Sequence, residues 1–162
     1  VRTVTEAMNL KRRVVENLRP ALLDHFGLPT ALEAYFDETC KRAGLECRTT
    51  IPDEADPIPQ ALAIALFRVG QESLTNIIRH AKARRVELSF EVGPTGYHLS
   101  IGDDGVGMDP ERARSSHGLS GMRHRVVSLN GSFEIQSTPG KGTRLDVQVP
   151  FASPAPASVT PA

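Results

Sequence analysis

The sequence predicts an α+β fold, a two-layer sandwich in which a mixed sheet of about five strands carries about three helices on one face. Apolar residues recur at three- and four-residue steps over much of the first half of the chain, a spacing typical of amphipathic helices. In the second half they alternate with polar residues, as they do in strands. The length of 162 residues fits a single hydrophobic core.

The N-terminal part of the chain predicts two helices separated by a break. The stretch from Val4 to Leu22 carries an apolar stripe between basic residues, so it predicts an additional N-terminal helix that needs a partner. Gly27 lies in the predicted break. Pro29 suits the first turn of the second helix, where a missing N–H leaves no hydrogen bond unmade, and Gly44 predicts its end.

Two further helices and the C-terminal tail are predicted from pattern and composition. A proline-rich loop precedes a long helix from about Gln60 to Ala81, and a shorter helix is expected from about Leu119 to Leu129. Residues 151–162 are uncharged and rich in Ala, Pro, Ser and Thr, which predicts a largely disordered tail.

Strands are predicted where apolar and polar residues alternate. They are expected over residues 45–51, 86–92, 97–101, 133–135 and 145–149. Gly93–Gly96 and Pro139–Gly142 have the residues of tight turns, so we expect each to close a hairpin.

The composition excludes several classes of function. The chain has 19 Lys+Arg and 19 Asp+Glu, so it lacks the overall positive charge typical of nucleic-acid-binding proteins. It has no apolar run of the roughly 18 residues that a membrane span requires, and we expect no direct membrane contact by this chain. Cys40 and Cys47 lack the spacing of a zinc site, and two cysteines fit a reducing, cytoplasmic location.

The long helix carries a polar stripe within an otherwise apolar segment. At 100° per residue Glu72, Asn76 and Arg79 fall within about 60° of one another. An amide oxygen is a neutral ligand suited to Mg²⁺, and a carboxylate one turn earlier could orient or deprotonate a nucleophile. A solvated helix face with a Glu–Asn pair explains this segment equally well when it is taken alone.

A second motif follows the strand that ends near Ile101. Strand alternation places Asp103 on the core side, where a carboxylate needs hydrogen-bond donors. The exocyclic amine of adenine is such a donor, whereas guanine presents an acceptor oxygen there. Gly105 and Gly107 have no Cβ, so the backbone can approach a flat ligand closely. The alternative is a tight turn with an Asx hydrogen bond.

A third motif, Gly118-Leu119-Ser120-Gly121-Met122, lies at a predicted helix start. Free N–H groups and the positive end of the helix dipole favour phosphate at such a position, although a simple glycine loop is an equal alternative. Gly140-Lys141-Gly142-Thr143 lacks the spacing of a P-loop and is not one.

In this order and spacing the motifs closely resemble the nucleotide-binding boxes of the histidine-kinase-like ATPase superfamily, over about residues 58–150. Leu18-Arg19-Pro20 with Gly27-Leu28, and the segment Gln71–Ala81, resemble the sensor kinases that include nitrate and desaturase-type membrane-fluidity sensors. The resemblance implies three parts: residues 1–24 as the C-terminal helix of a dimerisation hairpin, 25–150 as the catalytic ATPase domain, and 151–162 as the tail.

The resemblance also implies roles for the motif residues. Asn76 would coordinate Mg²⁺ on the ATP phosphates, and Glu72 would orient or activate the attacking imidazole. Asp103 would accept from the adenine amine with the help of Thr143. Residues 108–117 would form an ATP lid, expected to be mobile without nucleotide. The other implied ATP-binding residues are Arg79, His80, Gly105, Gly107, Met108, Gly118, Leu119, Ser120, Gly121 and Met122.

The resemblance implies partners that complete the reaction. A kinase of this type phosphorylates a histidine on its dimerisation hairpin and then a response regulator, usually as a homodimer that can be membrane-anchored. No histidine here is followed by Asp or Glu, as that acceptor would be, so we expect this chain to bind Mg-ATP without autophosphorylating. The alternatives are a nucleotide-binding or interaction module without kinase activity and an anti-sigma-type serine kinase.

Overall fold

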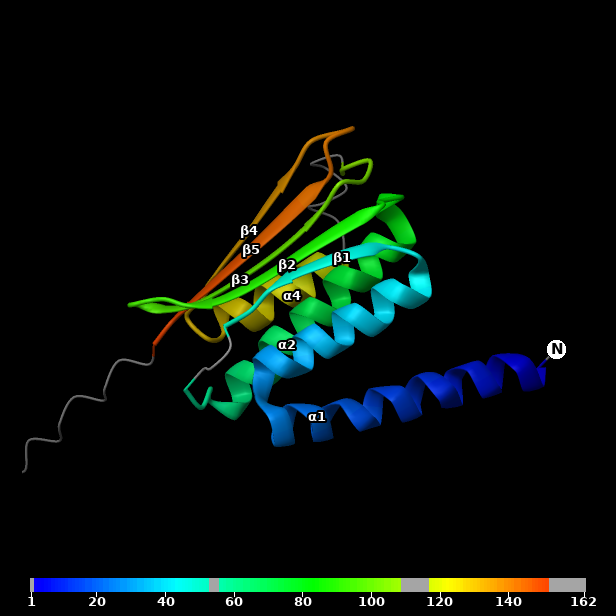
Figure 1. Cartoon of the computed structure of the whole chain (residues 1–162), viewed down its shortest axis with the longest axis horizontal. Helices are drawn as coiled ribbons and strands as arrows, with labels where there is room; N and C mark the ends of the chain where they lie inside the picture. Colours follow the sequence, from blue (N-terminus) through cyan, green and yellow to red (C-terminus); the bar gives the residue numbers. More distant parts are fainter. Residues whose placement is uncertain (1, 53–55, 109–116, 152–162) are drawn as a thin grey trace, which may run out of the picture.

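The core of the fold is a mixed sheet whose strands have one apolar face. A computed structural model describes residues 2–52, 56–108 and 117–151, with side chains from Leu23 onward (Figure 1). The strands are β1 (Glu46–Thr50), β2 (Arg85–Val92), β3 (Gly96–Asp103), β4 (Ser132–Ser137) and β5 (Thr143–Pro150). The order is β1-β2-β3-β5-β4, in which β1 and β2 are parallel and the other neighbours antiparallel. The predicted mixed five-stranded sheet is confirmed.

Three helices cover one face of this sheet, as predicted (Figure 1). They are α1 (Arg2–Ala43), of which only the part from Leu28 onward lies on the sheet, α2 (Gln60–Asn76) and α4 (His117–Val127). Alternate side chains of β2, Val86, Leu88 and Phe90, are buried beneath them, and Glu87 on the opposite face is exposed. The predicted tail from residue 152 and lid residues 109–116 lie outside the described residues.

The first helix is divided at the predicted break. Gly27 has φ 76° and ψ 172°, which end the first limb, and the second limb continues from Leu28. Figure 1 shows that the chain reverses direction at this elbow. A left-handed φ favours glycine, since it has no Cβ to clash with the carbonyl. The elbow therefore separates the N-terminal limb from the part of α1 that covers the sheet.

The long helix extends over the predicted residues, but its last turn is a π-helix and not an α-helix. Regular α-helix ends at Asn76, and residues Ile77–Ala81 form a π-helix, η1. Lys82 then has a left-handed conformation with φ 50°. The carbonyl of Ala81 accepts a hydrogen bond from the N–H of Val106, at 2.8 Å. The wider turn thus ends against the loop that follows β3, a contact that helical periodicity cannot predict.

The second limb of α1 packs closely on α2 because Gly70 lies at the crossing. A Cβ placed on Gly70 would lie 2.9 Å from Leu32 Cδ2 and 3.3 Å from Phe36 Cε2. Leu32 and Phe36 are both fully buried. This contact anchors α2, the helix that carries Glu72 and Asn76.

Replacing Phe36 with alanine should therefore destabilise the fold by about 3–5 kcal/mol, because it leaves a cavity in the α1–α2 contact. Phe26 is 62% exposed, so Phe26→Ala is a matched control expected to cost less than about 1 kcal/mol. Urea unfolding measures both free energies. Equal losses in the two variants would contradict this packing.

Candidate functional site

A cavity of about 740 Å³ opens between α2, η1, α4 and the sheet. Many of the predicted site residues line it: Asn76, His80, Asp103, Gly107, Met108, Leu119, Met122 and Thr143. They are far apart in sequence and come from helices, strands and the loop after β3. The structure thus brings the separate motifs to one place.

Apolar side chains from the core make up much of the remaining wall. The wall residues not predicted from the motifs are Ser73, Ile77, Ala81, Ile101, Val106, Ile135 and Leu145. Strand and helix periodicity marks most of them as core, so their sequence pattern gives no sign that they also border a cavity. A largely apolar pocket with a few polar groups is typical of a small-molecule site.

Asp103 ends β3 on the core side, as its strand position predicts. Its Oδ1 accepts the N–H of Gly105 at 2.8 Å, and it also accepts the backbone N–H of Thr143. Burial nevertheless raises the pKa of this carboxyl, against the opposing effect of the two N–H donors. The carboxylate therefore faces the cavity as an acceptor that a bound donor would stabilise.

The neighbouring Asp104 faces solvent and has a structural role. Its Oδ1 accepts the N–H groups of Arg84 and Arg85, each at 2.8 Å. These bonds lower the pKa of the Asp104 carboxyl, the opposite direction to Asp103. Of the two adjacent aspartates, Asp103 alone lines the cavity.

The loop after β3 passes so close to neighbouring backbone that it requires glycine. A Cβ on Gly105 would collide with the carbonyl of Ala81 and lie 2.7 Å from Asp103 Oδ1. Gly107 has φ 71°, and a Cβ there would collide with the carbonyl of Thr138. Both glycines are therefore needed to shape this wall, in agreement with the D-x-G-x-G motif.

The polar groups of α2 meet the start of α4 beside the cavity. Glu72 and Asn76 are half-buried. A Cβ on Gly118 would lie 2.7 Å from Glu72 Oε1 and 3.8 Å from Asn76 Nδ2. The helix and glycine motifs thus converge where N–H groups of the first turn of α4 have no partner within the helix.

Some predicted residues lie outside the cavity lining. Arg79 and Ser120 are exposed, and Gly121 is half-buried on α4. Glu72, Gly105 and Gly118 border the cavity through the contacts given above.

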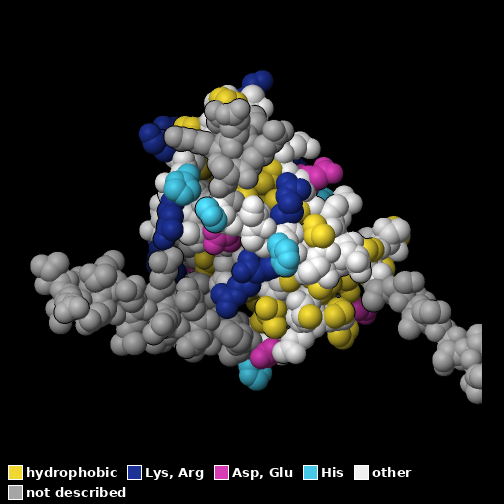
Figure 2. Space-filling view, turned by 180° about the vertical axis from the view of Figure 1, so that it is seen from behind, with side chains coloured by type: hydrophobic (Ala, Val, Ile, Leu, Met, Phe, Trp, Pro, Cys, Tyr) yellow, Lys and Arg dark blue, Asp and Glu magenta, His cyan; other side chains and the backbone are white. Residues whose placement is uncertain are grey.

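The helical surface around the site has a local positive charge although the chain is neutral. Glu72 is the one acidic residue in α2, η1 and α4. The basic and histidine side chains of these elements are exposed: Arg68, Arg79, His80, His117, Arg123, His124 and Arg125. Figure 2 shows Lys, Arg and His side chains distributed over this face. Such a surface attracts anions.

Among the residues that the structure describes, neither a protein-only metal cluster nor a membrane helix is found. Within the described ranges no group of three His, Cys, Asp or Glu side chains could hold a metal. None of the helices in the described part of the chain has the length and apolar character to cross a bilayer.

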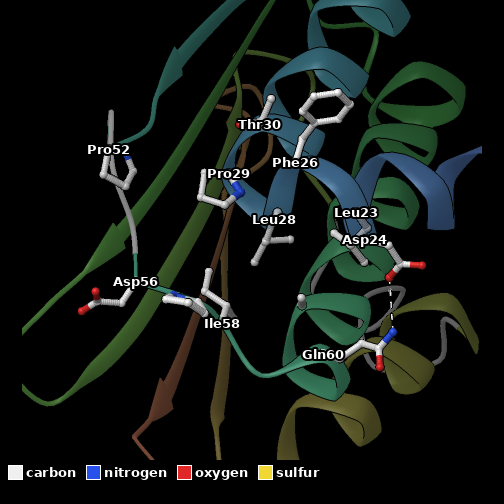
Figure 3. Close-up of a pocket in the computed structure, with 13 residues that line it drawn as sticks. Leu23, Asp24, Phe26, Leu28, Pro29, Thr30, Pro52, Asp56, Ile58 and Gln60 are labelled. Carbon is white, nitrogen blue, oxygen red and sulfur yellow. Dashed lines mark hydrogen bonds between the residues drawn. The ribbon is translucent and has the colours of Figure 1, made fainter.

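A second cavity, of about 640 Å³, lies at the elbow of α1 (Figure 3). Leu23, Phe26 and Ile58 are among its walls, and Gln60 Nε2 donates to Asp24 Oδ1 at 3.2 Å across one side. It contains none of the predicted site residues.

Comparison with known proteins identifies the domain. Residues 61–153, more than half of the chain, match the family described as histidine kinase-, DNA gyrase B-, and HSP90-like ATPase. The chain belongs to this ATPase family. It is 34% identical to the sensor histidine kinase LiaS of Bacillus subtilis over 90% of this chain and 40% of LiaS. It is also 34% identical to the histidine-protein kinase/phosphatase DegS of Brevibacillus brevis, over 88% of this chain and 37% of DegS.

Solved structures of histidine kinases share the fold of this ATPase domain. The histidine kinase domain of the blue-light activated kinase EL346 from Erythrobacter litoralis matches with a TM-score of 0.63 at 20% identity, over 76% of this chain and 61% of that one. Acinetobacter baumannii AdeS matches with a TM-score of 0.62 at 17% identity, over 94% of this chain and 84% of AdeS. The predicted resemblance to the ATP-binding domain of a sensor histidine kinase is confirmed, although the chain spans less than half of its curated relatives LiaS and DegS.

The two adjacent aspartates should respond to pH in opposite directions. Because the pKa of Asp103 is raised in the folded state, its contribution to stability falls as pH rises from about 3.9 through the folded pKa. Because the pKa of Asp104 is lowered, its stabilising contribution is present above about pH 3.9 and is lost as pH falls through the folded pKa.

Urea unfolding of the wild type, Asp103→Asn and Asp104→Asn between pH 3 and 7 tests this. From low to high pH the wild type should lose stability relative to Asp103→Asn and gain it relative to Asp104→Asn. Trends of the same sign would contradict the assigned environments.

Proposed function

We propose that this domain binds Mg-ATP and supplies the γ-phosphoryl group to a histidine on a dimerisation hairpin, for relay to a response-regulator aspartate. The observation that supports this most is the placement of Asp103 in the same cavity as Asn76, beside Glu72 and the start of α4. The two ends of the site thus differ in chemistry. One offers an acceptor in an apolar pocket, and the other offers polar side chains and free N–H groups.

Adenine fits the end of the cavity at Asp103. The carboxylate accepts from a donor, and the 6-amino group of adenine provides one while the 6-oxo group of guanine does not. Ile101, Ile135 and Leu145 give this part of the cavity apolar walls suited to a flat ring. We therefore expect the site to bind adenine nucleotides more tightly than guanine nucleotides.

The phosphates fit the end at Asn76 and Gly118. We propose that the first turn of α4 binds phosphate oxygens through its N–H groups, with the surrounding basic surface attracting the triphosphate. Asn76 would hold Mg²⁺, which neutralises phosphate charge when bound. The half-buried amide of Asn76 and the absence of a three-residue ligand cluster within the described ranges fit a metal held mainly by phosphates.

Glu72 is the proposed catalytic carboxylate. In the transfer, a ring nitrogen of the acceptor histidine forms a bond to the γ-phosphorus, the bond from phosphorus to the β–γ bridging oxygen breaks, and ADP leaves. Glu72 orients the imidazole through its other N–H and takes up the proton that the reaction releases. Its position beside Asn76 places this base next to the proposed phosphate site.

The proposed partners follow from this reaction. Residues 1–24 would be one helix of the hairpin, 25–150 the catalytic domain and 151–162 a tail. The whole protein would act as a homodimer with ATP, its hairpin and a response regulator as partners. We place the domain in the cytoplasm, where ATP is available, whether or not the parent protein is anchored in a membrane.

Nucleotide binding tests the site assignment. Asp103→Asn should lower ATP affinity about 10- to 100-fold, since a hydrogen bond to a charged group is lost. Asn76→Ala should remove most of the dependence of affinity on Mg²⁺. Calorimetric titrations with ATP and GTP, with and without Mg²⁺, measure both effects. Asp104→Asn is the control and should bind ATP normally; equal ATP and GTP affinities in the wild type would refute the assignment.

Transfer in trans tests the kinase reaction. With a separately expressed hairpin carrying the acceptor histidine, Mg-ATP should yield acid-labile phosphohistidine. Glu72→Gln should slow transfer about 10²- to 10⁴-fold while ATP affinity changes less than about threefold. Glu134→Gln, an exposed substitution on β4, is the control. ATP binding without any transfer would instead support a nucleotide-binding module.

A further inference from the structure

Ser137, at the end of β4, contacts two residues of the cavity wall and one neighbouring carbonyl through a single hydroxyl. Its Oγ lies 2.7 Å from the N of Met108, 2.9 Å from Thr143 Oγ1 and 3.2 Å from the carbonyl O of Gly142. Met108 and Thr143 line the cavity that contains Asp103 and Asn76, whereas Ser137 is not one of its lining residues. The side chain is half-buried.

One arrangement of hydrogens makes all three contacts hydrogen bonds. The Met108 N–H can only donate, so Ser137 Oγ accepts from it. The Gly142 carbonyl can only accept, so the single hydroxyl hydrogen of Ser137 is donated to it. The contact with Thr143 is then a hydrogen bond only if Thr143 donates its hydroxyl hydrogen to Ser137.

This arrangement determines what Thr143 presents to a ligand. With its hydrogen directed to Ser137, Thr143 Oγ1 has only lone pairs to offer the cavity. Asp103, its partner across β3 and β5, is also an acceptor. This wall therefore favours a donor, such as an amine or a water that passes a hydrogen on, over a second acceptor.

The same hydroxyl fixes the loop after β3. Met108 is bound to Ser137, and the carbonyl of Val106 accepts the N–H of Gly140 at 2.7 Å. These two bonds join the loop to the turn between β4 and β5. The Ser137 side chain therefore does two things. It holds the loop that forms this part of the wall, and it determines where the hydroxyl hydrogen of Thr143 points.

We propose that Ser137 is a positioning residue that makes Thr143 a hydrogen-bond acceptor and so contributes to the discrimination of 6-amino from 6-oxo purine nucleotides. This inference rests on the proposed function, since it assumes that the cavity binds ATP through its base. Ser137 itself does not touch the nucleotide in this proposal.

The test compares ATP with inosine triphosphate, whose 6-oxo group is an acceptor. Ser137→Ala frees the Thr143 hydroxyl to donate, so the ratio of ATP to inosine triphosphate affinity should fall about tenfold, the effect of one hydrogen bond. Ser137→Thr keeps a hydroxyl and should restore the ratio. Ser132→Ala, an exposed serine on the same strand, is the matched control and should leave it unchanged.

A variant of the partner residue separates this role from a general loss of structure. Thr143→Val should also lower the ratio, and adding Ser137→Ala to it should lower the ratio no further, because both act through one hydrogen bond. In the nucleotide-free protein the Met108 amide should exchange faster in Ser137→Ala and stay protected in Thr143→Val.

The outcomes distinguish this inference from the proposed function. If the wild type prefers ATP and Ser137→Ala keeps the full preference, or if Ser132→Ala loses as much, the role of Ser137 is overturned. If Ser137→Ala does not fold, an unchanged ratio in Thr143→Val overturns it equally. If the wild type binds no ATP, the proposed function fails and this inference fails with it. Faster exchange of the Met108 amide in Ser137→Ala would then still show the hydrogen bond between Met108 and Ser137.

Discussion

The half-buried carboxylate of Asp103 is the constraint on which the rest of the site depends. A carboxylate taken partly out of water requires donors, and here two backbone N–H groups supply them, from Gly105 and Thr143. The first requires the chain to turn immediately after β3. The second requires β5 to lie beside β3 in the observed register. The acceptor at the cavity wall thus results from the loop and the sheet together.

The turn after β3 in turn depends on the end of α2. The loop runs against the carbonyl of Ala81 so closely that Gly105 has no room for a Cβ. Because η1 ends there, the same short segment closes the last turn of the long helix and begins the cavity wall. The end of the helix and the loop are therefore in direct contact, which places the polar groups of α2 and Asp103 on walls of the same cavity.

Charge is distributed so that a neutral chain still has an anion-attracting face. The helices around the site contain one acidic residue, Glu72, and that residue lies beside the cavity. The acidic residues that balance the chain are elsewhere, including the outer face of the sheet, where Asp146 binds Arg144 at 3.1 Å. Overall neutrality argues against a general polyanion-binding protein, and the local arrangement agrees with binding a single small anion.

The sequence by itself determined the strands, most of the helices, the break at Gly27 and most of the polar residues that line the cavity, because periodicity and glycine placement are local properties. It also placed Asp103 on the core side by strand alternation alone. Only the tertiary structure decided that η1 is a π-helix, that core residues such as Ile135 also form the cavity wall, and that Ser137 lies between Met108 and Thr143. These features arise from contacts between residues distant in sequence. Neither residue of such a contact lies in a sequence motif that would predict the contact. A serine at the end of a strand has no distinguishing signal until the loop and the neighbouring strand are placed against its hydroxyl.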